Sequence, residues 1–328
     1  MSDPTPPPGS SDGSLPGDGA RPRSDGSQRP DGHRSGVTYR VTHRTDYRYS
    51  TSVSQSYSEA HLVPRRLPDQ VCVHREIVVR PEPRDYRERY DFFGNRASFF
   101  SLQEPHRALS VEATSVVNIV RPAAMPVPVS DPWEQAVHRI RTEVDAEIMT
   151  ARPYVLVSPL IATDPLLREY ARPSFVPGRP LAEAALDLSR RVHEDLTYQP
   201  GTTTIATSVG EVFERRTGVC QDFAHLTIAC LRSLGLPARY VSGYLETAPP
   251  SGERKLIGFE ASHAWLAVFV PGAGWFDLDP TNDCVPDDRY ITTAWGRDYA
   301  DVTPLNGIVF SGGAQEMTVE VTVTRLDL

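Results

Sequence analysis

Three short strings of the sequence contain the residue types of a nucleophilic site. In chain order they hold Cys220 in Gly-Val-Cys-Gln-Asp-Phe-Ala, His263 in His-Ala-Trp and Asp279 in Asp-Pro-Thr. A thiol is a weak nucleophile at neutral pH until its thiolate form is favoured, and a helix N-terminus favours that form. A base must then reach the sulfur, and a third group must orient the base. The chemistry therefore depends on whether the fold brings these three side chains together.

The thiol is expected in the first turn of a helix. Residues 208–211 read as a capping box that starts a short helix, which is expected to stop at Gly218. A second helix is expected to begin at about Cys220, and Gly235 and Pro237 should end it. Its apolar stripe consists of Phe223, Leu226, Cys230 and Leu234. The start of this helix supplies backbone N–H groups that favour a thiolate and can bind a tetrahedral oxyanion.

The imidazole and the carboxylate are expected on the two strands of one hairpin, residues 262–270 and 275–279. A hairpin centred on Pro271 places His263 directly opposite Asp279. Directly opposed residues share one face of a sheet, with Cβ atoms about 4.5–5.5 Å apart. An imidazole and a carboxylate can meet over that distance.

Asp277 is the competing carboxylate, because it has the same parity as Asp279. On the register above it would lie opposite Trp265, two residues nearer the turn, so the register favours Asp279. A turn centred on Gly272–Ala273 would point both aspartates away from His263 unless a bulge intervenes.

The elements around these strings predict an α+β domain that follows a β domain. Residues 1–36 are rich in Pro, Gly, Ser and Asp, which predicts a disordered tail. Alternating apolar residues then predict an antiparallel β-sandwich over 37–125. Helical segments followed by strands, the last of which carries Met317 to Val323, predict an α+β catalytic domain over 126–328.

Composition argues against several other classes of function. The net charge of −8 supplies no global basic field for nucleic acid or an anionic membrane. Lys255 is the one lysine and follows Arg254, so a Walker A loop is absent. No apolar stretch has the length of a membrane helix, and no secretory signal is readable. The four cysteines form no Cys-x-x-Cys pair and no calcium loop occurs, so we expect free thiols, no metal, no cofactor and a cytoplasmic location.

Taken together, the three strings resemble the core of the bacterial transglutaminase-like superfamily, whose fold is related to papain. The Gly-Val-Cys-Gln-Asp-Phe-Ala, His-Ala-Trp and Asp-Pro-Thr strings resemble its Cys, His and Asp motifs, in the family order. Residues 37–120 resemble the β domain that commonly precedes this core in bacteria. The resemblance implies that Cys220 is the nucleophile, His263 the general base and acid, and Asp279 the orienting carboxylate.

Several other residues carry weaker expectations. Tyr198 could lend a hydroxyl or a wall to the oxyanion side, and Trp265 either packs in the core or shields the imidazole. Ordinary structural roles are expected for a second group of residues, with a small chance of redox relevance for the last: Cys72, Cys230, His225, Asp222 and Cys284.

Attack of a thiolate on an amide carbonyl gives a thioester acyl-enzyme, which water or an amine can resolve. We favour hydrolysis of a protein or peptide, since no feature of the sequence marks an acceptor site; transamidation is the alternative. A non-catalytic protein-binding module with a vestigial thiol site also remains open. A glycosidase with paired carboxylates is a weaker possibility, because nothing selects a pair. The oligomeric state is not indicated.

Overall fold

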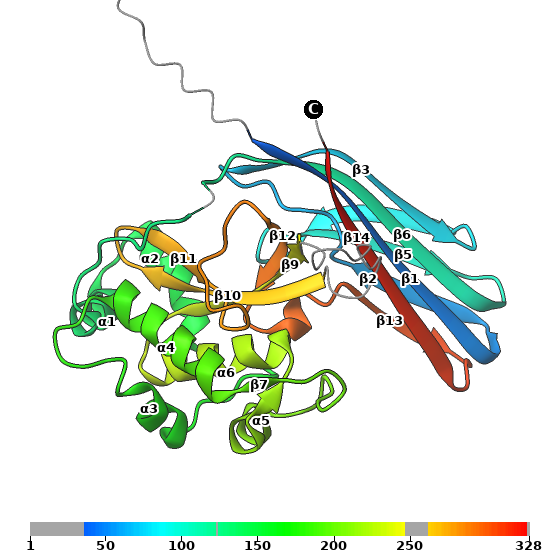
Figure 1. Cartoon of the computed structure of the whole chain (residues 1–328). Helices are drawn as coiled ribbons and strands as arrows, with labels where there is room; N and C mark the ends of the chain where they lie inside the picture. The colour runs from blue at the N-terminus through cyan, green and yellow to red at the C-terminus, as the bar shows by residue number, and fades with distance from the viewer. Residues whose placement is uncertain (1–35, 123, 247–261, 327–328) are drawn as a thin grey trace, which may run out of the picture. The chain divides into compact units, whose positions relative to one another are not determined.

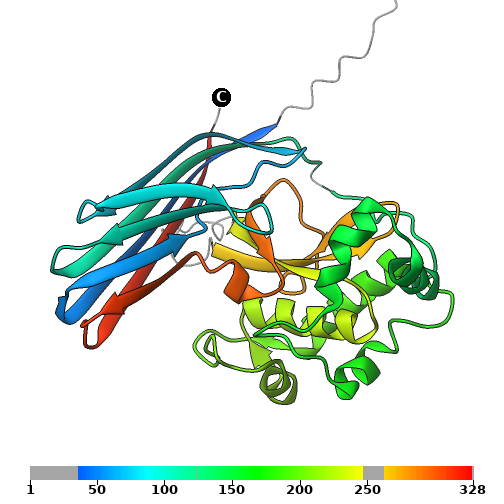
Figure 2. The same cartoon turned by 180° about the vertical axis from the view of Figure 1, so that it is seen from behind.

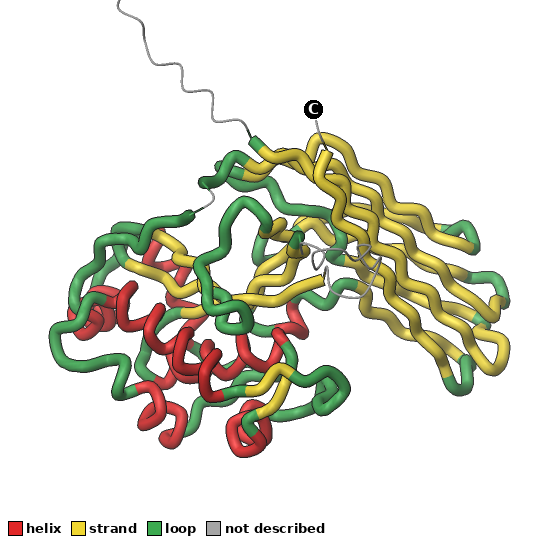
Figure 3. The backbone as a smooth tube through the Cα atoms, in the orientation of Figure 1, coloured by secondary structure: helices red, strands yellow, loops and turns green. Residues whose placement is uncertain are grey.

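The computed structural model describes residues 36–122, 124–246 and 262–326. The tail expected at 1–36 therefore lies outside the described residues, apart from Gly36. Residues 35–328 form one compact unit. Helices gather in one part of this unit and long strands in the other (Figure 3). None of the described helices is long and apolar enough to cross a membrane.

Six α-helices and two short 3-10 helices occur within the described ranges. They are α1 (Trp133–Thr142), α2 (Ala146–Ala151), η1 (Arg152–Val155), α3 (Pro165–Ala171), α4 (Leu181–Asp195), α5 (Val209–Arg215), α6 (Cys220–Ser233) and η2 (Tyr299–Asp301). The strands are β1 (Val37–Val53), β2 (Gln55–Ala60), β3 (Gln70–Arg80), β4 (Asp85–Tyr90), β5 (Arg96–Leu102), β6 (His106–Ile119), β7 (Thr197–Tyr198), β8 (Thr217–Gly218), β9 (Ala238–Leu245), β10 (Ser262–Val270), β11 (Gly274–Leu278), β12 (Tyr290–Gly296), β13 (Leu305–Phe310) and β14 (Gln315–Leu326).

The N-terminal strands β1 to β6, together with β13 and β14, build an antiparallel sandwich of two four-stranded sheets, with strand orders β14-β1-β6-β3 and β13-β2-β5-β4 (Figure 1). Its core is formed where Tyr49 and Val111 of the first sheet meet Phe100 of the second. The α+β class and the β-sandwich expected from the alternation of apolar residues are confirmed.

The C-terminal strands correct the expected domain bounds. We expected the strand that contains Met317 to belong to the catalytic domain over 126–328. Instead β14 pairs antiparallel with β1 along its whole length, and β13 pairs with β2. The chain thus leaves the sandwich, builds the helical part and returns to complete both sandwich sheets (Figure 2). Alternation of apolar residues predicts a strand but not its partner strand, and for this reason β14 was expected in the wrong domain.

One face of the sheet that contains β1 packs against two different parts of the molecule, the second sandwich sheet and the α+β part. At one end it packs on the second sandwich sheet. At the other end Tyr39 and Val41 pack with Tyr244 of β9 and Ile291 of β12. The Tyr39 hydroxyl also donates to Glu246 at 2.6 Å. The sandwich and the α+β part therefore share a buried contact.

The α+β part is built on a four-stranded antiparallel sheet with the order β11-β10-β9-β12. Helix α6 packs against one face of it, where Phe223 and Leu226 meet Ala264 and Leu266 in one core. The opposite face carries a second cluster that includes Val241, Trp265 and Tyr290. All eight residues of β9 are buried as a result.

Candidate active site

The structure places Cys220 at the first position of α6, as expected from the sequence. The Asp222 carboxylate accepts the backbone N–H of Val219 at 2.8 Å and the hydroxyl of Thr203 at 2.7 Å. Burial raises the pKa of Asp222, and these two hydrogen bonds oppose that shift. Asp222 thereby caps the helix start, and Cys220 is only partly buried there.

Gly218 is required by close packing rather than as a helix stop. Helix α5 ends earlier, where Arg216 adopts a left-handed conformation with φ 57°, so the expected stop at Gly218 is corrected. Gly218 lies in β8, and a Cβ built on it would stand 2.7 Å from the Cβ of Asp222. A side chain at this position would displace the residue that caps α6.

His263 and Asp279 are directly bonded. The His263 Nε2 lies 2.7 Å from the Asp279 Oδ2, and both side chains are buried. The hairpin register differs from the expected one, because Leu266 pairs with Leu278 and Ala267 with Asp277. The turn is thus centred on Gly272 rather than on Pro271. This shift moves each partner by two positions, which preserves the face of every side chain.

Asp277 therefore lies opposite Ala267 and not opposite Trp265, which corrects the expected position. No hydrogen bond joins it to His263 among the described residues. Asp279 follows the end of β11 and forms an isolated bridge with Cys284. The imidazole reaches Asp279 diagonally from β10.

Three donors converge on one oxygen of Asp279. Besides His263, the Asn282 side-chain amide at 2.6 Å and the Tyr290 hydroxyl at 2.7 Å donate to Oδ2. The backbone N–H of Thr281 donates to Oδ1 at 2.8 Å. Burial raises the pKa of Asp279, but the hydrogen bonds and the charge of His263 outweigh it, and the pKa lies below its usual value.

The imidazole is placed between the carboxylate and the sulfur. Burial lowers the pKa of His263, whereas hydrogen bonds to Asp279 and Cys220 and the charges of both groups raise it more strongly, to about 10. Because Nε2 faces Asp279, the Nδ1 atom is the one that can bond to Cys220. The fold thus brings Cys220, His263 and Asp279 together.

Aromatic rings enclose the imidazole. Trp265 is fully buried and stacks on His263 at 6.2 Å between centroids and 26° between planes, and Tyr290 packs at 6.0 Å. Gly243 makes room for the indole, since a Cβ there would lie 2.6 Å from it. Tyr198 lies in β7, where it pairs with Gly218 two residues before Cys220, and it is about half exposed.

Asn282 and Tyr290 are site residues that the sequence analysis missed. Asn282 follows directly after the Asp-Pro-Thr string, so its nearness in sequence was an available signal. Tyr290 opens β12, and nothing local distinguishes it from an ordinary strand tyrosine.

Most of the remaining residues singled out from the sequence lie apart from the three converging side chains, in the packed interior or within a strand. Burial raises the pKa of Cys230 to about 12 and lowers that of His225 to about 3, and His225 accepts the backbone N–H of Tyr299. Cys72 bonds to a backbone carbonyl in β3. Cys284 differs, since its sulfur lies 3.1 Å from the Tyr290 hydroxyl that holds Asp279.

A cavity of about 410 Å³ lies between the sandwich strands and the α+β part, and none of the three converging side chains lines it. Ser262, next to His263, and Tyr299 line it from the α+β part. Burial raises the pKa of Tyr299, and the charges of Tyr47 and Cys220 raise it further. The sandwich strands contribute His43, Thr45, Tyr47, Met317, Val319 and Val321.

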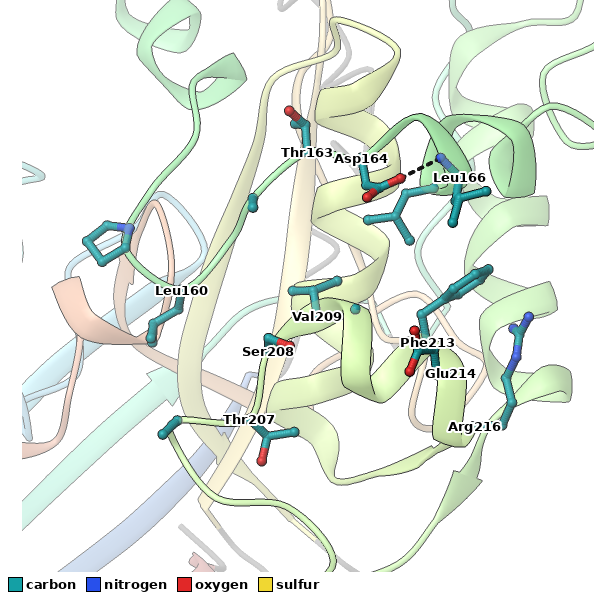
Figure 4. Close-up of a pocket in the computed structure, with 15 residues that line it drawn as sticks. Leu160, Thr163, Asp164, Leu166, Thr207, Ser208, Val209, Phe213, Glu214 and Arg216 are labelled. Atoms are coloured by element: carbon teal, nitrogen blue, oxygen red, sulfur yellow. Dashed lines mark hydrogen bonds between the residues drawn. The ribbon is translucent and has the colours of Figure 1, made fainter.

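A larger cavity of about 620 Å³ lies elsewhere, between α3, α5 and the segment before α3 (Figure 4). Asp164 beside it caps α3 through the N–H of Leu166 at 2.7 Å. None of the three converging residues lines this cavity. Within residues 36–122, 124–246 and 262–326, no three His, Cys, Asp or Glu side chains could together hold a metal ion.

Comparisons with known proteins agree with this architecture. The bacterial transglutaminase-like N-terminal region matches residues 39–118, and the transglutaminase-like superfamily matches residues 168–280. An uncharacterized protein of Mycobacterium tuberculosis is 45% identical over 292 residues, which cover 87% of this chain and 91% of that protein.

Two further proteins are similar over part of the sequence or in fold. The protein-glutamine gamma-glutamyltransferase of Pseudomonas aeruginosa is 33% identical over 113 residues, which cover 34% of this chain and 17% of that protein. The crystal structure of a proposed cysteine protease from Cytophaga hutchinsonii has the same fold, with a TM-score of 0.71 at 23% identity over 89% of this chain and 92% of that one. The chain belongs to the transglutaminase-like superfamily, in the form that carries the bacterial N-terminal region.

Proposed function

We propose that this protein is a cysteine enzyme that transfers acyl groups from amide bonds of a protein or peptide, with hydrolysis as the favoured outcome. Cys220 is the nucleophile, His263 the general acid and base, and Asp279 the orienting carboxylate. The observation that carries the proposal is the position of the His263 imidazole, bonded on one side to Asp279 and on the other to Cys220 at a helix start.

In the first half-reaction His263 holds the proton of the Cys220 thiol, and the thiolate sulfur attacks the amide carbonyl carbon and forms a tetrahedral oxyanion. The N–H groups of Cys220 and Gln221 begin α6 and have no acceptor within the helix, so they are suited to bind that oxyanion. His263 donates its proton to the leaving nitrogen, the C–N bond breaks and the amine departs. A thioester remains on Cys220.

In the second half-reaction His263 accepts a proton from the attacking water. The hydroxide oxygen bonds to the thioester carbon, the C–S bond breaks and the carboxylic acid leaves. The raised pKa of His263 keeps its imidazole protonated at neutral pH, so a proton is present for the leaving amine. Trp265 shields the imidazole, and the cavity between Tyr299 and the sandwich strands offers a path for an extended peptide.

Transamidation is the second candidate, in which a primary amine replaces water. It is supported by the similarity of this core to the Pseudomonas aeruginosa protein-glutamine gamma-glutamyltransferase. Glutamine-containing peptides, incubated with and without an added primary amine, separate the outcomes by mass. Deamidation or cleavage indicates hydrolysis, and an amine adduct indicates transamidation.

The thiol itself is tested by alkylation. Iodoacetamide at mildly acidic pH is expected to label Cys220 before Cys72, Cys230 and Cys284, because only its sulfur pairs with an imidazole. Cys220→Ala and His263→Ala are expected to abolish acyl transfer and leave the fold intact. Uniform slow labelling would favour a binding module, and full activity of Cys220→Ala would overturn the assignment.

A further inference from the structure

A second cavity, of about 470 Å³, lies on the face of the central sheet that faces away from α6. Residues of the sandwich, of the linker after it and of the α+β part line it together. Its polar members are Asp69, Arg121, Arg239, Asp277 and Thr292, and its apolar members include Leu67, Pro68, Met125, Val285 and Pro286. None of the residues that carry the proposed reaction lines this cavity.

The Arg239 side chain on β9 is buried but has no hydrogen-bonded or ion-paired partner among the described residues. The residue is only 8% exposed, and its Nε has no hydrogen-bond partner among the described residues. Two indoles contact its guanidinium, whose carbon lies 4.3 Å from the Trp275 ring centre and 3.7 Å from that of Trp295. Arg239 lines the cavity, and no hydrogen bond from its guanidinium occurs among the described residues.

A second cation increases the local positive charge. The guanidinium of Arg65 lies 3.5 Å from the Trp295 ring centre. Burial lowers the pKa of Arg239 to about 10; the charge of Asp277 opposes that shift, and the charge of Arg65 adds to it. Leaving a buried charge without a hydrogen-bonded partner is costly, so this arrangement favours an added negative group.

The carboxylates near the cavity do not supply a hydrogen-bonded partner for Arg239. Asp69 is bound to the Nε of Arg121 at 2.6 Å, so these two charges offset one another. Burial raises the pKa of Asp277, and the charges of Arg239 and Arg121 oppose that shift without a hydrogen bond to either group. Among the described residues, neither carboxylate lies within ion-pair distance of Arg239.

We propose that this cavity binds a small monocarboxylate with an apolar body, whose two oxygens bond to the edge of Arg239. The planar fork of a guanidinium matches a carboxylate in two parallel hydrogen bonds. The apolar lining suits an aliphatic or aromatic body, and the volume is within the usual range for small-molecule sites. A doubly charged phosphate fits less well, because Asp69 and Asp277 also line the cavity.

N-acetyl-phenylalanine is the probe, titrated into the full chain with calorimetry and tryptophan fluorescence as readouts. Trp275 and Trp295 both line the cavity, so binding of the probe should change the tryptophan fluorescence until the cavity is saturated. The neutral N-acetyl-phenylalanine amide and inorganic phosphate are expected to bind about ten- to a hundredfold more weakly, the range for losing a hydrogen bond to a charged group. Equal binding of the amide, or no saturable binding of the acid, would overturn the proposal.

Two pairs of variants locate the bound carboxylate. Arg239→Gln should weaken binding by a similar factor, and Arg172→Gln, an exposed arginine outside the cavity, should not. Met125→Asp places a negative charge at the rim and should also weaken binding, whereas Met125→Leu should not. Met125 is exposed, so this pair tests the site even if Arg239→Gln fails to fold. Undiminished binding to Met125→Asp contradicts the site.

The inference is independent of the proposed reaction. Binding of the probe should persist in Cys220→Ala, because that residue does not line the cavity. Loss of catalysis with intact binding, or the reverse, therefore distinguishes failure of one proposal from failure of the other.

Discussion

Five hydrogen bonds hold the carboxylate of Asp279, and only one of them comes from His263. The others come from the side chains of Asn282 and Tyr290 and from the backbone N–H groups of residues 281 and 282. A carboxylate with this many donors keeps its charge and its direction when the imidazole moves. At the scale of single residues, the geometry of the site therefore depends on the surroundings of Asp279 as much as on the three converging side chains.

The variant Asp279→Asn tests the charge of this group. Asp279 raises the pKa of His263, so its neutral replacement should lower that pKa. The alkaline fall in activity, which follows loss of the His263 proton near pH 10, should move to lower pH. Activity should drop on the order of 10⁴-fold, against on the order of 10⁶-fold for Cys220→Ala, the scale seen in serine-protease triads. The readout is the pH profile of kcat/KM.

Asp277→Asn is the matched control for this experiment. Asp277 pairs opposite Ala267 and has no hydrogen bond to His263 among the described residues. The pH profile of Asp277→Asn should have its alkaline limb at the same pH as that of the wild-type protein. If the alkaline limb moved in Asp277→Asn but not in Asp279→Asn, Asp277 would be the residue that orients the imidazole.

At the scale of elements, the start of α6 positions the sulfur. Strands β7 and β8 pair in parallel, so the chain that leads into Cys220 lies beside Tyr198. Asp222 then accepts the N–H of Val219 and closes the first turn. The absence of a side chain at Gly218 permits this close approach.

Gly218→Ala should destabilise the protein and impair the site together. The added Cβ would lie 2.7 Å from the Cβ of Asp222, and such overpacking costs about 1–3 kcal/mol of unfolding free energy. Displacement of Asp222 should also slow alkylation of Cys220. Urea unfolding and iodoacetamide rates measure the two effects.

Gly210→Ala in α5 is the control, because the nearest atom to its added Cβ is 4.0 Å away. Alanine is favoured over glycine in a helix by about 1 kcal/mol, so this variant should be neutral or stabilising. If both alanine variants behaved alike, the contact with Asp222 would not be the reason for the glycine.

At the scale of the whole molecule, the sandwich and the central sheet are joined at the free edge of β12. The buried Gln70 side chain bonds to both the N–H and the carbonyl of Thr292 at 2.8 Å. Asn95 does the same for Trp295, at 2.9 and 2.8 Å. Two amide side chains thus satisfy backbone groups that an edge strand would otherwise leave unpaired.

This joint predicts that residues 35–328 unfold together. The variant Val321→Ala removes buried volume from β14 and should cost about 1–3 kcal/mol. All four tryptophans, Trp133, Trp265, Trp275 and Trp295, lie outside the sandwich strands. Their fluorescence should nevertheless report the lower urea midpoint, in coincidence with circular dichroism.

Val319→Ala on the same strand is the control, since Val319 is 40% exposed and Val321 only 2%. It should leave the midpoint almost unchanged. A tryptophan transition that does not move in Val321→Ala would show that the sandwich and the α+β part unfold separately.

A cytoplasmic location remains a prediction from the sequence, to be tested by fractionation.

The sequence by itself determined what depends on local signals: the family strings, the start of α6 at Cys220 and the alternation that makes the sandwich strands. Parity also kept Asp279 on the face of His263 although the register was wrong by two residues. Only the tertiary structure decided the partner of β14, the support of Asp279 by Tyr290 and the stacked position of Arg239. These depend on contacts between residues far apart in the chain, and local periodicity carries no information about which distant strand or side chain will meet another.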